Sequence, residues 1–167
     1  TYLDSVVYGD ELVTNGDFNS NTGWILQPDF SISNGLLVGS NAGNYKLNVQ
    51  TVSDLVTDKF YVIEFVVSEV TSGTIRCGFI GGTDNIATPN IAQAGVYTVI
   101  VKAITGNNTV FIGSAGAGFT GSVDSISVKE VIGGQVSGTP LLRTAAINEP
   151  RLEYDAQGNA LGLLIEE

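Results

Sequence analysis

The stretch that decides the fold runs Phe60-Tyr61-Val62-Ile63-Glu64-Phe65-Val66-Val67. Its odd-numbered positions are all apolar or aromatic, whereas its even-numbered positions include a charge, Glu64. Because successive side chains of a β-strand point to opposite faces, the odd-numbered set is predicted to face a core. Val62 and Val66 are apolar as well, so the opposite face of this strand is predicted to be partly covered by a loop or by another subunit.

Runs of the same alternating or β-branched kind recur along the chain and predict eight strands. They span Glu11–Thr14, Phe30–Gly39, Tyr45–Ser53, Lys59–Val70, Thr74–Gly81, Val96–Ile104, Asn108–Ser114 and Gly121–Ile132. Turn signals separate them, and Asn34-Gly35 inside the second run is typical of a two-residue hairpin loop. No segment carries a sustained helical period, so helix is expected to be nearly absent. The sequence predicts an all-β fold, a two-sheet antiparallel sandwich, with Ile126 and Val128 inside it.

Composition excludes several classes of function. The chain has 167 residues, 43% of them hydrophobic, enough for one domain with its own core. It has no histidine and a single cysteine, Cys77, which excludes histidine-based sites and an internal disulfide. Seventeen acidic against seven basic residues give a net charge of −10, which argues against nucleic acid as a partner.

Two expectations concern the chain as a whole. No apolar run approaches the roughly 20 residues of a membrane helix, so no membrane insertion is expected. The chain begins with Thr1 rather than methionine, which suggests processing or a longer parent polypeptide.

The composition of the sequence changes after Ile132. Gly133-Gly134 opens a polar linker, and two apolar runs separated by a Gly-containing loop follow at Arg151–Tyr154 and Ala160–Ile165. We therefore expect an N-terminal extension (1–10), a sandwich domain (11–132), and a linker with a C-terminal β-hairpin tail (133–167). A lone hairpin is marginal in water, so the tail must dock on something. The residues expected to mediate that assembly are Leu152, Tyr154, Leu161, Leu163, Leu164 and Ile165.

Four motifs in order resemble carbohydrate-binding modules of the family 4/9 type. They are Leu12-Val13-Thr14-Asn15-Gly16-Asp17-Phe18 with Gly23-Trp24, Tyr61-x-Ile63-x-Phe65-x-Val67-Ser68, Gly95-Val96-Tyr97-Thr98 and Phe119-Thr120-Gly121-Ser122-Val123-Asp124-Ser125-Ile126-Ser127-Val128. Together they span roughly residues 11 to 131. The resemblance implies that the sandwich is a jelly roll.

The tail carries a second resemblance. Asn148-Glu149-Pro150-Arg151-Leu152-Glu153-Tyr154-Asp155 and Leu161-Gly162-Leu163-Leu164-Ile165-Glu166-Glu167 look like a segment found in bacteriophage tail-fibre and other virion structural proteins. This resemblance implies a virion location, contacts with other virion proteins, and a homo-oligomer, namely the trimer typical of such fibres.

The first resemblance also implies a structural Ca2+ ion between the first and last strands. The candidate ligands are Asn15, Asp17, Asn19 and Asp124, because calcium prefers hard oxygen ligands. Asn19 stands where the family has an acid, which lowers the expected affinity. The alternative is an Asn15-Gly16 turn in which Asp17 caps local backbone amides.

Glycan contacts are expected where aromatic rings are exposed, because the apolar face of a sugar stacks on a π surface. Trp24 lies where the family buries a side chain, and Tyr97 alternates with Val99 and Val101, so both are predicted to be core. Tyr45 remains as a candidate platform. Arg76 is a candidate donor to a sugar hydroxyl, although a solvated strand residue is the commoner case.

No catalytic group can be nominated. Cys77 has no histidine to activate it, so a buried inert thiol is expected. Adjacent acids such as Asp10 and Glu11 point apart on a strand and cannot act as a carboxylate pair. The glycines of 113–118 are followed by no helix, so a flexible loop is expected there rather than a phosphate cradle.

The leading prediction is therefore a non-enzymatic bacteriophage virion structural module, a tail-fibre, capsid-fibre or decoration protein at the particle surface. The alternative is a calcium-stabilised carbohydrate-binding module that recognises host surface glycans. Two or more exposed aromatics on a concave face would favour glycan binding, whereas a large subunit interface would favour the structural role.

Overall fold

The structure, a computed structural model, describes residues 6–53, 55–82, 84–116 and 118–133 in full. Residues 143–144, 151–154 and 160–164 are described by their strand pairing alone. The described residues contain strands and no helix, so none of them forms a helix long and apolar enough to cross a membrane. The predicted all-β fold is confirmed.

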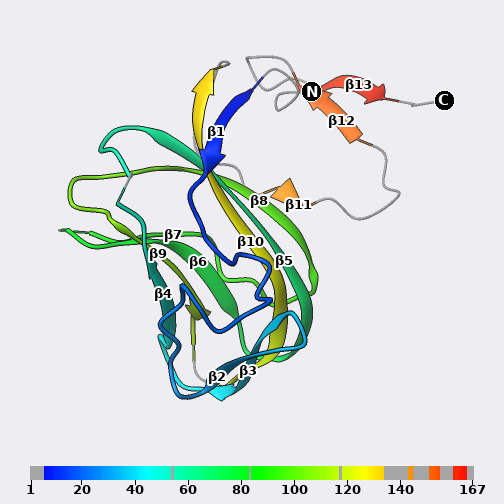
Figure 1. Cartoon of the computed structure of the whole chain (residues 1–167). Coiled ribbons are helices and arrows are strands. Elements are labelled where there is room, and N and C mark those ends of the chain that lie inside the picture. Colours follow the sequence, from blue (N-terminus) through cyan, green and yellow to red (C-terminus); the bar gives the residue numbers. More distant parts are fainter. Residues whose placement is uncertain are drawn as a thin grey trace.

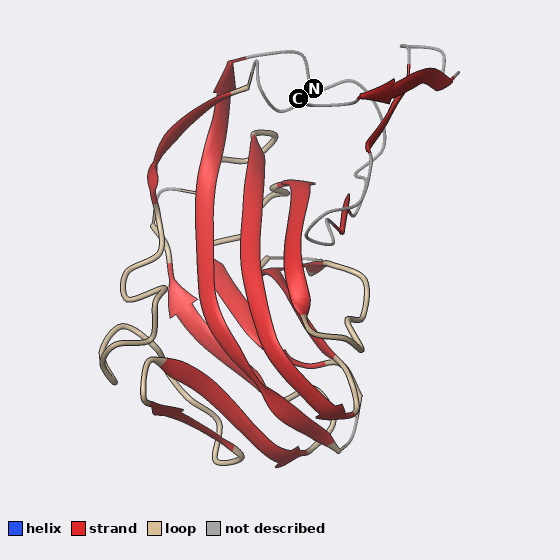
Figure 2. Cartoon of the chain, turned by 90° about the vertical axis from the view of Figure 1, so that its right-hand side faces the viewer, coloured by secondary structure: helices blue, strands red, loops and turns tan. Residues whose placement is uncertain are grey.

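Two antiparallel sheets pack face to face (Figures 1 and 2). The larger sheet has the order β11-β8-β5-β10-β3-β2, with β1 also paired to β10. Its strands are β1 (Val7–Glu11), β2 (Phe30–Ser33), β3 (Leu36–Ala42), β5 (Phe60–Ser72), β8 (Gly95–Lys102), β10 (Phe119–Gly133) and β11 (Arg143–Thr144). The smaller sheet has the order β4-β9-β6-β7 and consists of β4 (Leu47–Thr51), β6 (Ile75–Ile80), β7 (Ile86–Ala87) and β9 (Thr109–Ser114). A separate two-stranded sheet pairs β12 (Arg151–Tyr154) with β13 (Ala160–Leu164).

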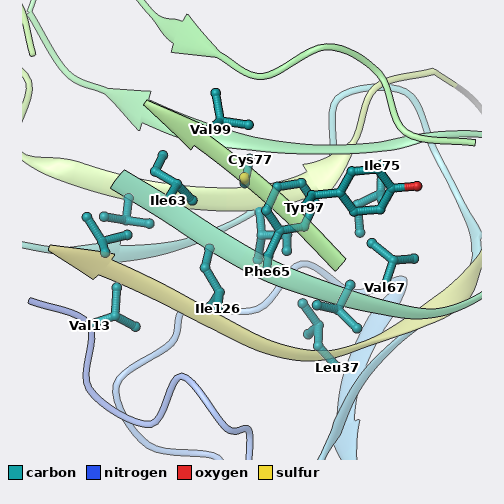
Figure 3. Close-up of a cluster of buried hydrophobic side chains, with 14 of the residues drawn as sticks. Val13, Leu37, Ile63, Phe65, Val67, Ile75, Cys77, Tyr97, Val99 and Ile126 are labelled. Carbon is teal, nitrogen blue, oxygen red and sulfur yellow. The ribbon is translucent and has the colours of Figure 1, made fainter. Parts of the chain in front are cut away.

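The core lies between the two sheets, and Ile63, Phe65 and Val67 of β5 belong to it (Figure 3). Phe65 stacks on Tyr97 of β8 with ring centroids 5.2 Å apart, and Tyr61 meets Phe79 of the smaller sheet edge-on at 5.6 Å. Val62, on the opposite face of β5, is buried as well, and Val66 is partly buried. The predicted two-sided cover of this strand is therefore confirmed.

Other predictions about the core hold. Ile126 and Val128 of β10 are buried, and so is Trp24, whose ring centroid lies 5.7 Å from that of Phe18. The Asn34-Gly35 pair forms the two-residue loop between β2 and β3, with φ values of 53° and 73°. Positive φ at both loop positions is the requirement of the hairpin turn that matches strand twist.

The first strand is shifted from its prediction. β1 ends at Glu11, where the predicted strand 11–14 begins. The cause is the Glu11 carboxylate, which accepts hydrogen bonds from the amides of Val13 and Val128 and thereby takes these donors from a continuing ladder. The predicted boundary between residues 10 and 11 thus falls inside β1, and the predicted linker and tail (133–167) contribute β11, which pairs with β8.

Candidate functional site

The predicted glycan-binding residues lie together on the outer face of the smaller sheet, the face turned away from the core. Arg76 is on β6, and Tyr45 is in the loop between β3 and β4. The guanidinium carbon of Arg76 lies over the Tyr45 ring, 4.9 Å from its centroid. Tyr45 is 56% exposed and Arg76 is partly buried, so both side chains are available at the surface. The sequence nominated each residue separately, and the fold makes them one site.

Arg76 reaches Tyr45 across strand β9, and the residue of β9 that lies between them is a glycine, Gly113. In the sheet register Arg76 is paired with Gly113 of β9, and Gly113 with Leu47 of β4. Gly113 offers no side chain to obstruct the Arg76 side chain on its way to the loop beside β4. A Cβ at position 113 would lie 2.1 Å from the Lys46 carbonyl oxygen, so no larger residue fits there.

Phe111 is a part of the site that sequence reasoning missed. Its neighbours Val110 and Ile112 belong to the core cluster, so Phe111 itself points to the outer face of β9. It is nevertheless only 1% exposed, and the Arg76 guanidinium carbon lies 5.9 Å from its ring centroid. Three apolar residues in succession at 110–112 are the signal that would have indicated a strand covered on both faces.

The backbone beside Tyr45 is held by the buried hydroxyl of Ser114. The Lys46 amide donates to Ser114 Oγ at 2.9 Å, and Ser114 Oγ donates in turn to the Gly43 carbonyl. The Ser114 amide donates to the Lys46 carbonyl at 3.1 Å. On the other side of the loop, the Gly43 amide donates to Asp29 Oδ2 at 3.0 Å.

These contacts decide between two overlapping predictions. Gly113 and Ser114 fall both in the predicted strand 108–114 and in the predicted flexible loop 113–118, and they are buried residues at the end of β9, so for them the strand prediction is confirmed and the loop prediction is wrong. They are buried because the Tyr45 loop closes over them.

Tyr45 itself has an unfavourable backbone conformation. Its φ is +53°, in the left-handed region that bulky residues seldom adopt. Such strain costs on the order of 1 kcal/mol and persists only where the surroundings enforce it. Here the Ser114 and Asp29 hydrogen bonds enforce it, and the result is an aromatic ring held at the surface.

The cation at the site, Arg76, has no acidic partner among the described residues, although the chain is rich in acids. Lys59 and Lys102 form ion pairs with Glu130 and Asp58, at 3.3 and 2.6 Å. Arg76 has no ion pair or hydrogen bond with any other residue that the structure describes, and its Nε is buried without a partner. The two rings provide its contacts instead.

The site has one exposed ring. Tyr45 is the single aromatic residue among the large hydrophobic side chains that are exposed within the described ranges. The multi-ring surface that would favour glycan binding most strongly is therefore absent from these residues, and any stacking contact at this site depends on Tyr45.

The predicted calcium ligands lie around one turn and one bulge. The Asn15 side chain accepts from the Ser20 amide at 3.1 Å and donates to the carbonyls of Ser20 and Thr22, so it organises the turn. Asn19 Nδ2 donates to Asp17 Oδ2 at 2.5 Å. The turn is thus held by the Asn15 side chain rather than by Asp17 capping of backbone amides.

The fold brings this turn to β10. The Ile126 amide donates to the Gly16 carbonyl at 2.8 Å. Asp124, two residues earlier, is exposed and lies at a register shift between Val123 and Ser125. The donor atoms are oxygens, which suit calcium, yet the described residues contain no group of three or more acidic, cysteine or histidine ligands.

The predicted assembly residues have a defined register but no described side chains. Leu152 is paired with Leu163, Tyr154 with Ala160, and Arg151 with Leu164. Leu161 lies in β13, and Ile165 falls outside the described residues.

Cys77 is fully buried in β6, and burial raises the pKa of its thiol far above the ordinary value. A hydrogen bond with Thr88 opposes this shift weakly. A thiol in this state supplies no thiolate nucleophile.

Comparison with known proteins establishes the fold. No family model and no curated protein matches the chain. Solved structures do match it, and two of them are mutants of family 29 carbohydrate-binding modules, one of them made to probe ligand recognition by that family. Each is 12% identical to this chain and covers 75% of it, over 92% and 86% of their own lengths, with TM-scores of 0.51 and 0.50. The chain therefore has the jelly-roll fold of these modules, which differ in family from the 4/9 type that its motifs resemble.

Proposed function

We propose that this chain is a non-catalytic carbohydrate-binding module and that Tyr45 and Arg76 contact the sugar. The observation that carries the proposal is the pair itself, an exposed ring held in a strained loop with a guanidinium against it. The structural likeness to carbohydrate-binding modules of family 29 supports the proposal at the level of the fold.

The chemistry of the pair suits a saccharide. The exposed part of the Tyr45 ring offers a flat apolar surface for the C–H face of a pyranose. The guanidinium N–H groups of Arg76 are donors for sugar oxygens at the edge of that surface. Holding the ring in place before binding reduces the conformational entropy lost on association.

The test is affinity electrophoresis of the full chain in gels that contain a panel of soluble neutral and acidic polysaccharides. At least one polymer is expected to retard the protein, and Tyr45→Ala is expected to abolish the retardation while the variant stays folded. Val96→Ala is the matched control, because Val96 is also exposed but lies on β8 in the other sheet. Retardation by no polymer, or retardation that Tyr45→Ala leaves unchanged, would contradict the proposal.

A second candidate function is assembly within a virion through the C-terminal hairpin, as in the leading prediction from the sequence. What favours it is that, among the strands that the structure describes, β12 and β13 pair with each other and with no strand of either sandwich sheet. An isolated two-stranded hairpin is marginally stable in water, so a partner surface is needed. The two functions are compatible in one adhesin at a particle surface.

Light scattering tests the assembly function. The full chain is expected to form a homo-oligomer, with a trimer as the expected state, and a variant that lacks residues 145–167 is expected to be smaller. The truncation retains Arg143 and Thr144 because these residues pair with β8. An unchanged oligomer, or a monomer in both cases, would contradict a role of the hairpin in assembly.

A further inference from the structure

We infer that the saccharide bound at Tyr45 and Arg76 is acidic, a uronic acid or similar sugar whose carboxylate is received by the Arg76 guanidinium. This inference rests on the proposed function and names the class of its ligand. It follows from three features of the site: a partly buried cation without a counter-ion among the described residues, a guanidinium whose carbon lies over two rings, and a second cation in the loop that carries the platform.

The first feature is the missing counter-ion. The chain has 17 acidic and seven basic residues, so a cation on its surface has many carboxylates available to it. Lys59 and Lys102 each form an ion pair, whereas Arg76, Lys46 and Lys129 have none among the residues that the structure describes. Of these three, Arg76 alone has a buried side-chain nitrogen without a hydrogen-bond partner. A partly buried guanidinium without a partner leaves its charge-assisted hydrogen bonds unmade, and these are the strong ones.

The second feature is the orientation of contacts around the guanidinium. Its carbon lies over two rings, 4.9 Å from the Tyr45 centroid and 5.9 Å from that of Phe111. Ring contacts engage the face of a guanidinium and leave donors at its edge. A carboxylate binds at that edge through two parallel hydrogen bonds, a geometry that a neutral hydroxyl cannot reproduce.

The third feature is the local charge around the platform. Lys46 follows Tyr45 directly and also lacks an ion pair within the described part of the chain. Asp29 is the acid in contact with this loop, and its Oδ2 accepts a hydrogen bond from the Gly43 amide. The loop that carries the ring therefore has a second cation besides Arg76, on a protein whose net charge of −10 would otherwise repel an anionic polymer.

The experiment compares each acidic polymer with its own uncharged form. Polygalacturonate, polymannuronate and polyglucuronate are each reduced at the carboxyl group to the neutral polymer of the same linkage. Affinity electrophoresis and calorimetry with the full chain are run on both forms, and dextran sulfate serves as an anion without carboxylates. At least one carboxylated polymer is expected to bind ten times or more tightly than its reduced form, and sodium chloride is expected to weaken that binding.

Variants assign the effect to the guanidinium. Arg76→Met is expected to lower affinity for the acidic polymer to that for the reduced one, and Arg76→Lys to retain part of the preference because it keeps the charge but loses the planar fork. Lys129→Met is the matched control, since Lys129 also lacks an ion pair among the described residues but lies on β10 in the other sheet. Thermal melts establish that each variant is folded.

The outcomes separate this inference from the proposed function. Equal or tighter binding of the reduced polymers would overturn the inference and leave carbohydrate binding intact. Tighter binding of dextran sulfate than of every uronate would show a general anion site and overturn the carboxylate assignment. Binding of none of the six polymers would overturn the inference, and carbohydrate binding itself would be overturned only if the wider polysaccharide panel also failed to retard the chain. Loss of preference in Lys129→Met as large as in Arg76→Met would show that overall charge, rather than this site, selects the ligand.

Discussion

The side-chain amide of Gln50 pairs with the backbone of Thr14 through both of its polar atoms. Nε2 donates to the Thr14 carbonyl at 2.8 Å, and Oε1 accepts from the Thr14 amide at 2.7 Å. Gln50 points inward from β4 at the edge of the smaller sheet, and it is 5% exposed. Its amide therefore takes the place of a neighbouring strand and holds the segment after β1 against the sandwich.

Replacing Gln50 by alanine is expected to destabilise the protein by about 2 kcal/mol, because a donor and an acceptor of Thr14 lose their partners. For a chain of this size the melting temperature should fall by about 4 to 8 °C. Thermal unfolding measures the effect. Thr51→Ala is the control, since Thr51 is the next residue of β4 and is exposed. An equal effect of the two substitutions would show that the Thr14 segment does not depend on Gln50.

Strict alternation in the sequence predicted the central strand well and the edge strand poorly. Residues 61–67 of β5 lie against the core, so the apolar period of this segment reports its inward face directly. In β4 the order is reversed, because Asn48 and Gln50 point inward while Leu47 and Val49 are only partly buried. Asn48 makes the same kind of contact as Gln50: its Nδ2 donates to the Ile112 carbonyl, and its Oδ1 accepts from the Gln27 amide. The partners of these amides are distant in sequence, so no local pattern reveals them.

The sequence predicted two residues of the candidate site, Tyr45 and Arg76, but it did not predict that they lie in contact. Tyr45 is a candidate from sequence as an aromatic residue that could line a concave face, and Arg76 as a strand residue that could donate to a sugar hydroxyl. Their contact depends on the register that pairs Arg76 with Gly113 and Gly113 with Leu47. The register of three neighbouring strands is set when segments distant in sequence pair in the folded protein. It therefore cannot be predicted from the local sequence of any one strand.

If the turn at Asp17 and the bulge at Asp124 share a calcium ion, removal of calcium is expected to lower the melting temperature. A ligand that binds only the folded protein stabilises it by mass action. The measurement is a thermal melt in excess chelator and another in excess calcium chloride, with Asp124→Asn run in both. Superimposable curves for the unsubstituted chain would show that the Asn15 hydrogen bonds alone hold the turn. A calcium shift that persists in Asp124→Asn would place the ion elsewhere.

The buried thiol of Cys77 predicts a loss of stability in alkaline solution. Burial raises the pKa of this thiol, so the folded chain keeps its proton at pH values where the unfolded chain, with a pKa of about 8.5, releases it. The stabilisation is complete below that pH and declines above it by about 1.4 kcal/mol per pH unit, which amounts to about 2 kcal/mol at pH 10. Urea unfolding of the chain and of Cys77→Ala between pH 7 and 10 measures this loss. The variant starts less stable because of the cavity, and its stability should decline less steeply with pH.

The strained backbone of Tyr45 predicts that, at this position, a glycine variant is more stable than an alanine variant, which is the reverse of the usual order. Glycine adopts a φ of +53° without the steric cost that a Cβ brings, so Tyr45→Gly is expected to be about 1 kcal/mol more stable than Tyr45→Ala. At Thr51, in extended strand, the order should be the usual one, with glycine the less stable by about 0.5 to 1 kcal/mol. Urea unfolding of the four variants tests both orders. If alanine is as stable as glycine at position 45, the loop relaxes on substitution and the Ser114 and Asp29 hydrogen bonds do not enforce the conformation. If glycine is the more stable and binding is lost in both Tyr45 variants, the chain gives up folding stability at this position to keep an aromatic ring against Arg76.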